Sequence, residues 1–260
     1  MTDAANNSAP FHHYVPRFYL EGFVDPSLSQ GDRPMHSVWL YRRNKRPRHV
    51  SIRKVGGEPG FYRHEAGDFE PQLMRRESEW AVLLAKLLKD KRLVGSDRLE
   101  FSRFIGAMGT RVPHFYDMTH AIASHLDEYI ALRARDDKDA ERIREQLTAS
   151  NLLPPKLTKQ WMLTEILETG TDYMHHVYDQ MNWLVVETGG DDDYVVTSDT
   201  PVSLTDPHGP EFTTTGMRFS VDTEMTLPLD RKHVLFGTLK RREGSSGSGL
   251  SFPSDQSPHD

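Results

Sequence analysis

The spacing of apolar residues divides the chain into three parts. Near residues 37–41 and 49–52, short runs rich in β-branched and aromatic side chains flank a polar turn, which predicts a small hairpin. From about residue 69 the apolar positions follow the period of a helix. After residue 182, short apolar runs between turns return. We therefore expect an α+β fold with a small N-terminal β unit, a central helical layer and a C-terminal antiparallel sheet.

Two of the predicted helices carry opposite charges on otherwise apolar stripes. Glu77 lies on the first stripe, and Arg111 lies on the second, in a helix that begins near Asp97. The apolar members of the two stripes are Leu73, Trp80, Leu84, Leu87, Phe104, Met108 and Phe115. This pattern predicts a partly buried ion pair. One interpretation is an internal pair that fixes helix packing. The other is a carboxylate with a shifted pKa beside a phosphate-binding guanidinium.

Two further helices follow in the central part of the chain. Gly109 and Pro113 are expected to interrupt the second helix. The pattern then predicts one long helix over residues 115–147, whose charged part at 133–146 projects into solvent, and another over residues 158–181.

The last third predicts two hairpins. Residues 183–187 and 194–197 flank a turn-rich segment, and residues 225–229 and 233–237 flank a second turn. At the two ends, residues 1–10 predict disorder, and the Gly/Ser-rich residues 241–260 predict a flexible tail. We expect residues 11–240 to form a single α+β domain.

Composition narrows the class of protein. Of the 260 residues 37% are hydrophobic, while the mean hydropathy of −0.62 indicates a heavily charged surface. The absence of cysteine excludes disulfides, thiolate metal sites and cysteine nucleophiles. No apolar run approaches the roughly 20 residues of a membrane-spanning helix, and no basic-then-apolar leader opens the sequence. We expect a cytoplasmic protein without membrane contact.

An aromatic segment at residues 11–23 also carries His12, His13 and Arg17. Its rings need burial, and its polar groups need partners if they are buried too. We therefore predict an arm that lies across the core between helix and sheet, presenting one histidine and Arg17 at its surface. Adjacent side chains point apart, so only one of the two histidines can readily face a given site.

Three sequence motifs resemble those of an uncharacterised bacterial family known as domain of unknown function 4238. They are the run at 12–23, the run at 51–57 followed by an aromatic pair, and the run at 197–201 followed by residues 227–229. The resemblance spans about residues 11–236, with Thr200 standing where the family usually has Asn. It implies a shared fold and a recurring acid and Arg-x-Pro at Glu77 and Arg111, but it implies no activity.

Carboxylates suggest two further sites. Asp199 either caps a turn ahead of Pro201 or acts with a histidine of the arm in acid–base or metal chemistry. Glu168, Asp172 and His176 share a helix face by their spacing of four, as ligands of a divalent metal would. The alternative for these three is a solvated polar face.

The segment at residues 41–54 is basic and contains no acid. Its arginines Arg42, Arg43, Arg46 and Arg48 predict contact with phosphate groups, and nucleic acid is the candidate partner. The alternative is a hairpin edge whose charge discourages aggregation.

Motifs of several enzyme classes are absent, among them Gly-x-Ser-x-Gly, His-Glu-x-x-His, the phosphate loop and Gly-x-Gly-x-x-Gly. The leading hypothesis is a hydrolase acting on a phosphate-containing substrate, with a metal-dependent phosphodiesterase or nuclease as the specific candidate and a divalent metal as the candidate cofactor. The catalytic candidates are His12, His13, Glu77 and Asp199, and the substrate-binding candidates are Arg17 and Arg111. The alternative is a non-catalytic nucleic-acid- or protein-binding module.

Overall fold

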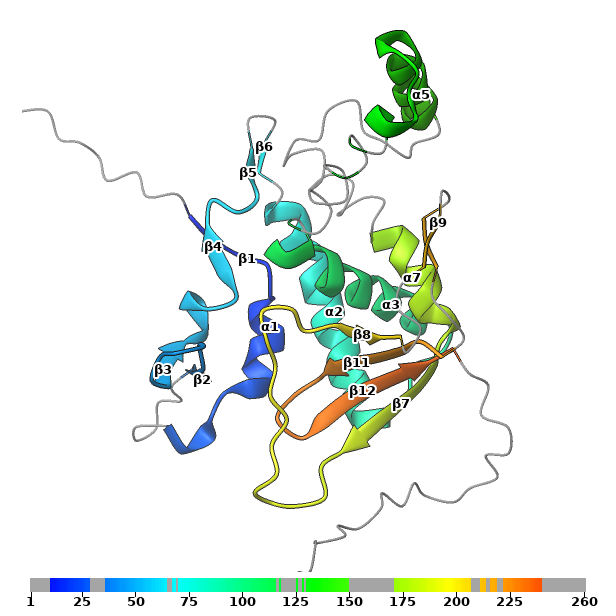
Figure 1. The fold of residues 1–260 in the computed structure, drawn as a ribbon. Coiled ribbons are helices and arrows are strands. Elements are labelled where there is room, and N and C mark those ends of the chain that lie inside the picture. Colours follow the sequence, from blue (N-terminus) through cyan, green and yellow to red (C-terminus); the bar gives the residue numbers. More distant parts are fainter. Residues whose placement is uncertain are drawn as a thin grey trace, which may run out of the picture.

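The fold combines helices with antiparallel sheets, as the α+β prediction requires. The computed structural model describes residues 10–28, 36–64, 67–68, 70–115, 117, 125, 128, 130–149, 171–206, 211–213, 216–218 and 222–239. In Figure 1 the small N-terminal strands lie on the left, helices α2 (Glu70–Asp90) and α3 (Gly95–Thr110) in the centre, and a larger C-terminal sheet in front of them. The predicted N-terminal disorder, apart from residue 10, and the predicted tail lie outside the described residues.

Three small two-stranded sheets make up the N-terminal β unit. They pair β1 (Phe11–His13) with β4 (Gly57–Pro59), β2 (Ser37–Leu40) with β3 (Arg48–Ser51), and β5 (Arg63–His64) with β6 (Gly67–Asp68). The helical segments α1 (Arg17–Leu20), η1 (Glu21–Phe23), η2 (Pro26–Leu28) and η3 (Ile52–Lys54) connect them. The hairpin predicted near residues 37–52 is confirmed, with Val38, Leu40 and Val50 packed against the core.

The longer helices whose bounds lie within the described residues are α2 (Glu70–Asp90), α3 (Gly95–Thr110), α5 (Asp137–Ala149) and α7 (Thr171–Gln180). Helix α3 ends before Pro113, as predicted. The prediction of one unbroken helix over residues 115–147 is wrong, because residues 134–136 are not helical and α5 starts anew. The Asp136 carboxylate accepts the backbone N–H of Asp139 at 2.8 Å, which favours a new helix start. Residues 158–170 of the last predicted helix lie outside the described part.

The C-terminal sheet contains β7 (Asn182–Glu187), β8 (Ser203–Thr205), β11 (Glu224–Pro228) and β12 (His233–Thr238), in the order β7-β12-β11-β8. Strands β9 (Glu211–Thr213) and β10 (Gly216–Arg218) form a separate pair. The predicted β11–β12 hairpin is confirmed.

The other predicted hairpin is wrong. Strand β7 pairs with β12, and residues 194–197 form no strand. The Val195 N–H instead donates to the Arg231 carbonyl at 2.8 Å, in the turn before β12. Strand β12 pairs along the full length of β7, from Asn182 to Glu187, and the longer ladder satisfies the backbone groups that a local hairpin would otherwise use.

Phe104 on α3 lies where the arm, α2 and α3 meet. Its ring centroid is 5.6 Å from that of Phe18 on the arm, 5.5 Å from Trp80 and 5.1 Å from Phe101. Full burial of each such side chain contributes about 2–3 kcal/mol of hydrophobic stabilisation. None of the described helices has the length and apolar character needed to cross a bilayer.

The arm also contacts the sheet. The buried Tyr19 hydroxyl donates to the Pro228 carbonyl at 2.8 Å and lies 2.7 Å from the Thr197 hydroxyl. Because the same arm packs on Phe104, the prediction that it runs between helix and sheet is confirmed.

Candidate functional site

Strand pairing fixes the position of both arm histidines. In the β1–β4 register, His12 lies opposite Glu58 and His13 opposite Gly57. A Cβ atom on Gly57 would come within 2.3 Å of the His12 carbonyl oxygen, so only glycine permits this close backbone approach. The pairing continues with the Val15 N–H, which donates to the Gly56 carbonyl at 2.9 Å. Gly56 and Gly57 therefore allow the arm to pair closely with the segment that contains β4.

His12 is an internal residue, only 2% exposed. Its Nδ1 atom accepts the backbone N–H of Tyr62 at 2.9 Å, and its ring stacks on the Tyr62 ring. The Tyr62 hydroxyl also donates to the His13 carbonyl at 3.3 Å. These contacts join the arm to the segment after β4, which favours a positioning role for His12.

His13 is half-buried and points to the other side of the strand. Its Nε2 atom lies 3.1 Å from the Ile52 carbonyl oxygen; a carbonyl only accepts, so Nε2 carries the proton and donates. Burial lowers the pKa of His13, and the charges of Arg17 and Arg111 act in the same direction, while the Ile52 carbonyl and Glu77 oppose the shift. His13 is therefore a neutral imidazole near pH 7 with its lone pair on Nδ1.

Glu77 and Arg111 form the predicted ion pair. Arg111 Nη1 donates to Glu77 Oε1 at 2.9 Å, and the Arg111 side chain is 0% exposed while that of Glu77 is 23% exposed. Arg111 Nε also donates to the Tyr14 carbonyl at 2.6 Å. The pair therefore ties α2 and α3 to the arm, which favours the interpretation as an internal pair.

Arg17 and Asp199 remain at the surface. Both are exposed, and neither side chain has a hydrogen-bond or ion-pair partner among the described residues. The turn at 198–200 is capped by the Ser198 hydroxyl, which accepts the Thr200 N–H at 3.1 Å and donates to the Thr200 carbonyl at 2.8 Å. Asp199 is therefore not needed to close this turn.

The electrostatic contacts group the candidates around two neighbouring residues of the arm. Arg17, Glu77 and Arg111 all influence the pKa of His13. Burial raises the pKa of the next side chain, Tyr14, and the Asp199 charge raises it further. The charges that act on these two residues come from the arm, both central helices and the segment after β7. The Asp199 charge thus acts on the pKa of Tyr14, and within the described residues Asp199 makes no hydrogen bond or ion pair with a histidine.

A family model described as "Protein of unknown function (DUF4238)" matches residues 12–249. The chain belongs to the DUF4238 family. No curated protein and no solved structure matches it. The resemblance that the arm and its companion motifs indicated is thus confirmed, and the matched region contains every candidate residue described above.

The candidate metal ligands of this DUF4238 protein fall outside what the structure describes. Within the described ranges, no three His, Asp or Glu side chains are grouped as a metal site requires. Glu168 and the side chains of Asp172 and His176 lie outside the described part, so that predicted ligand set stays a prediction.

The basic segment forms the turn and one strand of the β2–β3 hairpin. Residues 41–49 are all exposed, and the Lys45 N–H donates to the Arg42 carbonyl at 3.1 Å to close the turn. The side chains of Arg42, Arg43, Arg46 and Arg48 have no hydrogen-bond or ion-pair partners within the described ranges. The Arg42 charge lowers the pKa of Tyr14, which burial and two carboxylates otherwise raise. The positive charge of the hairpin thus influences the pKa of a residue on the arm.

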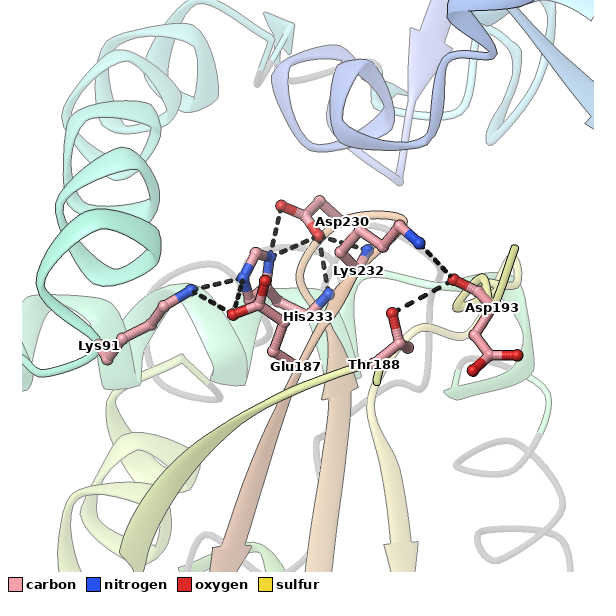
Figure 2. Close-up of polar contacts among 7 residues, drawn as sticks. All are labelled: Lys91, Glu187, Thr188, Asp193, Asp230, Lys232 and His233. Carbon is pink, nitrogen blue, oxygen red and sulfur yellow. Dashed lines mark hydrogen bonds and ion pairs between the residues drawn. The ribbon is translucent and has the colours of Figure 1, made fainter. Parts of the chain in front are cut away.

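A second polar cluster, which the sequence patterns did not indicate, surrounds His233 at the start of β12. Figure 2 shows His233 between Asp230 and Lys91, with Glu187 beside it. The Asp230 carboxylate lies 2.9 Å from His233 Nδ1 and accepts the His233 N–H at 2.8 Å. His233 Nε2 lies 3.5 Å from Glu187 and contacts Lys91 at the end of α2. In the sequence, the short spacing of Asp230 and His233 across a predicted turn is the pattern that could have indicated this cluster.

Lys232 joins the same turn to the loop after β7. Its Nζ atom donates to the carbonyls of Gly190, Asp191 and Asp193 at 2.9, 2.7 and 2.8 Å. Figure 2 shows this lysine extending toward Asp193, whose carbonyl also accepts the Thr188 hydroxyl. The contacts of His233 and those of Lys232 both join parts of the chain that are distant in sequence, so a structural role accounts for this cluster.

Proposed function

We propose that the arm site hydrolyses a phosphate ester, with His13 as general base and Arg17 as the phosphate-binding cation. The observation that carries this proposal is the fixed tautomer of His13: Nε2 donates to the Ile52 carbonyl and Nδ1 keeps its lone pair. The hydrogen bond to a backbone carbonyl orients the ring, as second partners of catalytic histidines commonly do.

The electrostatics around His13 suit a base. Burial lowers its pKa, so the imidazole is neutral at physiological pH and can take a proton from an attacking water. The Glu77 charge raises the same pKa and so stabilises the imidazolium that forms after proton transfer. Glu77 therefore acts in this proposal by stabilising charge.

Arg17 supplies the cation for the substrate. Its guanidinium is exposed, lacks a partner among the described side chains and is close enough to act on the pKa of His13. A planar guanidinium binds two phosphate oxygens at once. Arg111 is assigned to positioning instead, because its buried side chain holds the Tyr14 carbonyl and Glu77.

Asp199 and His12 take different parts in the proposal. Asp199 provides an exposed carboxylate whose charge acts on Tyr14 and which is available to bind a divalent metal. His12 positions the strand through Tyr62. The assignment to the cytoplasm remains a prediction from the sequence, and the absence of cysteine is consistent with it.

The test is hydrolysis of p-nitrophenyl phosphate and bis(p-nitrophenyl) phosphate by the full chain, with EDTA or with added Mg²⁺, Mn²⁺ or Zn²⁺. We expect turnover that falls by about 10²-fold or more in kcat for His13→Gln, the range typical of a missing general base. Arg17→Gln should raise KM. The exposed Arg92, on the turn after α2, gives the matched control Arg92→Gln, which should leave turnover unchanged.

Thermal melts separate chemistry from folding. If His13→Gln and Arg17→Gln melt like the parent chain and hydrolyse as fast, or if no metal condition gives turnover, the hydrolase proposal is wrong. Asp199→Asn in the same assay shows whether that exposed carboxylate takes part.

A second candidate function, non-catalytic nucleic-acid binding, is favoured by the hairpin. Its four arginines are exposed, unpaired within the described structure and free of neighbouring acids in sequence. Replacing Arg42 and Arg46 with Gln should weaken binding to any oligonucleotide. It should also flatten the dependence of log K on log salt by about 0.7–0.9 for each phosphate that the variant no longer neutralises. Equal binding by parent and variant at all salt concentrations would exclude the hairpin as the contact surface.

A further inference from the structure

The β2–β3 hairpin exposes aromatic side chains beside its arginines. Trp39 is 46% exposed and Tyr41 is 67% exposed. Alternation along β2 explains this, because Val38 and Leu40 face the core and the residue between them faces outward. Large exposed rings next to unpaired cations indicate a binding surface rather than a solvated edge.

The Trp39 ring is held in place from two sides. Across the pair of strands it lies directly opposite His49, and the two ring centroids are 3.5 Å apart. The pKa of Asp25 is lowered, first by the Ser27 hydroxyl and to a smaller extent by Arg231 and by a hydrogen bond from the Trp39 side chain. The backbone of Asp25 is itself tied to β2 through the Ser37 carbonyl at 3.3 Å. The indole is therefore preorganised while nearly half of its surface remains open.

We infer that this hairpin binds single-stranded nucleic acid, with unpaired bases stacked on Trp39 and Tyr41 and phosphates bound by Arg42, Arg43, Arg46 and Arg48. Open aromatic faces stack on splayed bases, which a duplex keeps inside its own stack. The basic segment contains no acid, which gives charge complementarity to a polyanion. The inference deepens the second proposed function and rests on it.

The hairpin surface lies beside the arm. Arg42 lies at the base of the turn, and its charge lowers the pKa of Tyr14 on the arm. Strand β3 runs directly into Ile52, whose carbonyl accepts the His13 Nε2–H at 3.1 Å, so the hairpin adjoins the proposed hydrolytic site. The inference does not require hydrolysis, because binding is measured without turnover.

Fluorescence anisotropy of a labelled twelve-nucleotide dT oligomer, its RNA counterpart and a duplex of equal length tests the inference on the full chain with EDTA present. We expect the single strands to bind more tightly than the duplex. Trp39→Leu should weaken single-strand binding by about ten-fold, since stacking on one aromatic ring is worth about that much, without changing the slope of log K against log salt. Trp39→Phe, which keeps a ring, should restore most of the affinity.

Arginine variants give the opposite pattern. Arg43→Gln and Arg48→Gln should lower both the affinity and the salt slope, while the control Arg92→Gln changes neither. Tyr41→Leu repeats the stacking test at a highly exposed position, where loss of folding is not expected. A thermal melt identifies any variant that weakens binding through misfolding.

Four outcomes would overturn the inference. Equal affinity for duplex and single strand, or parent-like binding by both Trp39→Leu and Tyr41→Leu, would exclude base stacking while leaving arginine-dependent binding intact. Tighter binding of a polyglutamate peptide than of any oligonucleotide would assign the surface to an acidic protein segment. A parent chain that binds no nucleic acid would overturn both this inference and the second proposed function.

Discussion

Arg111 Nε donates to the Tyr14 carbonyl at 2.6 Å, a contact that joins residues 97 positions apart in the sequence. The same guanidinium pairs with Glu77 at 2.9 Å. One buried cation thus joins the arm, α2 and α3, and the position of His13 depends on it because His13 directly precedes Tyr14. The ion pair connects the stability of the fold to the geometry of the candidate site.

Removing Glu77 alone should lower the free energy of unfolding more than removing Glu77 and Arg111 together. Glu77→Leu leaves the Arg111 charge buried without its counterion, and we expect the free energy of unfolding to fall by about 3 kcal/mol. Glu77→Leu combined with Arg111→Leu should recover part of this loss, because no unpaired charge remains. Urea unfolding of the single and double variants measures both values. A double variant less stable than Glu77→Leu would contradict the internal-pair interpretation.

The close approach of β1 and β4 should not tolerate a side chain at Gly57. A Cβ atom there would lie 2.3 Å from the His12 carbonyl oxygen, a backbone atom with little freedom to move. We expect Gly57→Ala to destabilise the fold by about 3 kcal/mol, at the upper end of the usual cost of overpacking. Gly189→Ala is the matched control, since nothing lies within 4 Å of its added Cβ. Equal melting temperatures for the two variants would show that the strands can separate.

Stability should fall as the pH falls because of His13. Burial lowers the pKa of His13 in the folded protein below its ordinary value of 6.5, so below that pH the unfolded chain binds the proton more readily. The contribution of neutral His13 to the free energy of unfolding is therefore complete above about pH 7 and is lost as the pH falls toward the pKa of His13 in the folded protein. Urea titrations at a series of pH values should show a smaller pH dependence for His13→Gln. The acid limb of any hydrolytic activity should also lie below pH 6.5, the ordinary value.

Lys232 should hold the loop after β7. Its ammonium group donates to the three carbonyls of Gly190, Asp191 and Asp193, which no other described lysine does. Lys232→Met should speed amide hydrogen exchange in residues 188–195 and reduce stability by about 1 kcal/mol, a modest value because the site is partly open to solvent. Lys89→Met removes an exposed lysine at the end of α2 and should change neither measurement. Unchanged exchange in Lys232→Met would mean that the loop is held by other interactions.

Local patterns were sufficient for helices α2 and α3 and for two hairpins. Apolar spacing placed Glu77 and Arg111 on two neighbouring apolar stripes, and the structure pairs them at 2.9 Å. Such patterns fail where a distant partner competes: β7 binds β12 instead of residues 194–197, because the tertiary ladder satisfies more backbone groups than the local hairpin would. The break before α5 was missed because an Asp cap at 136 outweighs an otherwise continuous helical pattern.

The sequence by itself determined the α+β class, the aromatic arm, the basic hairpin and the family, because each depends on residue type and short-range spacing. Only the tertiary structure decided which histidine is internal and which keeps an oriented lone pair, since Tyr62 and Ile52 approach the arm through strand pairing and a close glycine contact. It also decided that the Asp199 charge acts on Tyr14 and that His233 contacts Lys91. Contacts between residues far apart in the chain depend on how whole elements pack, and that information is not contained in any local pattern.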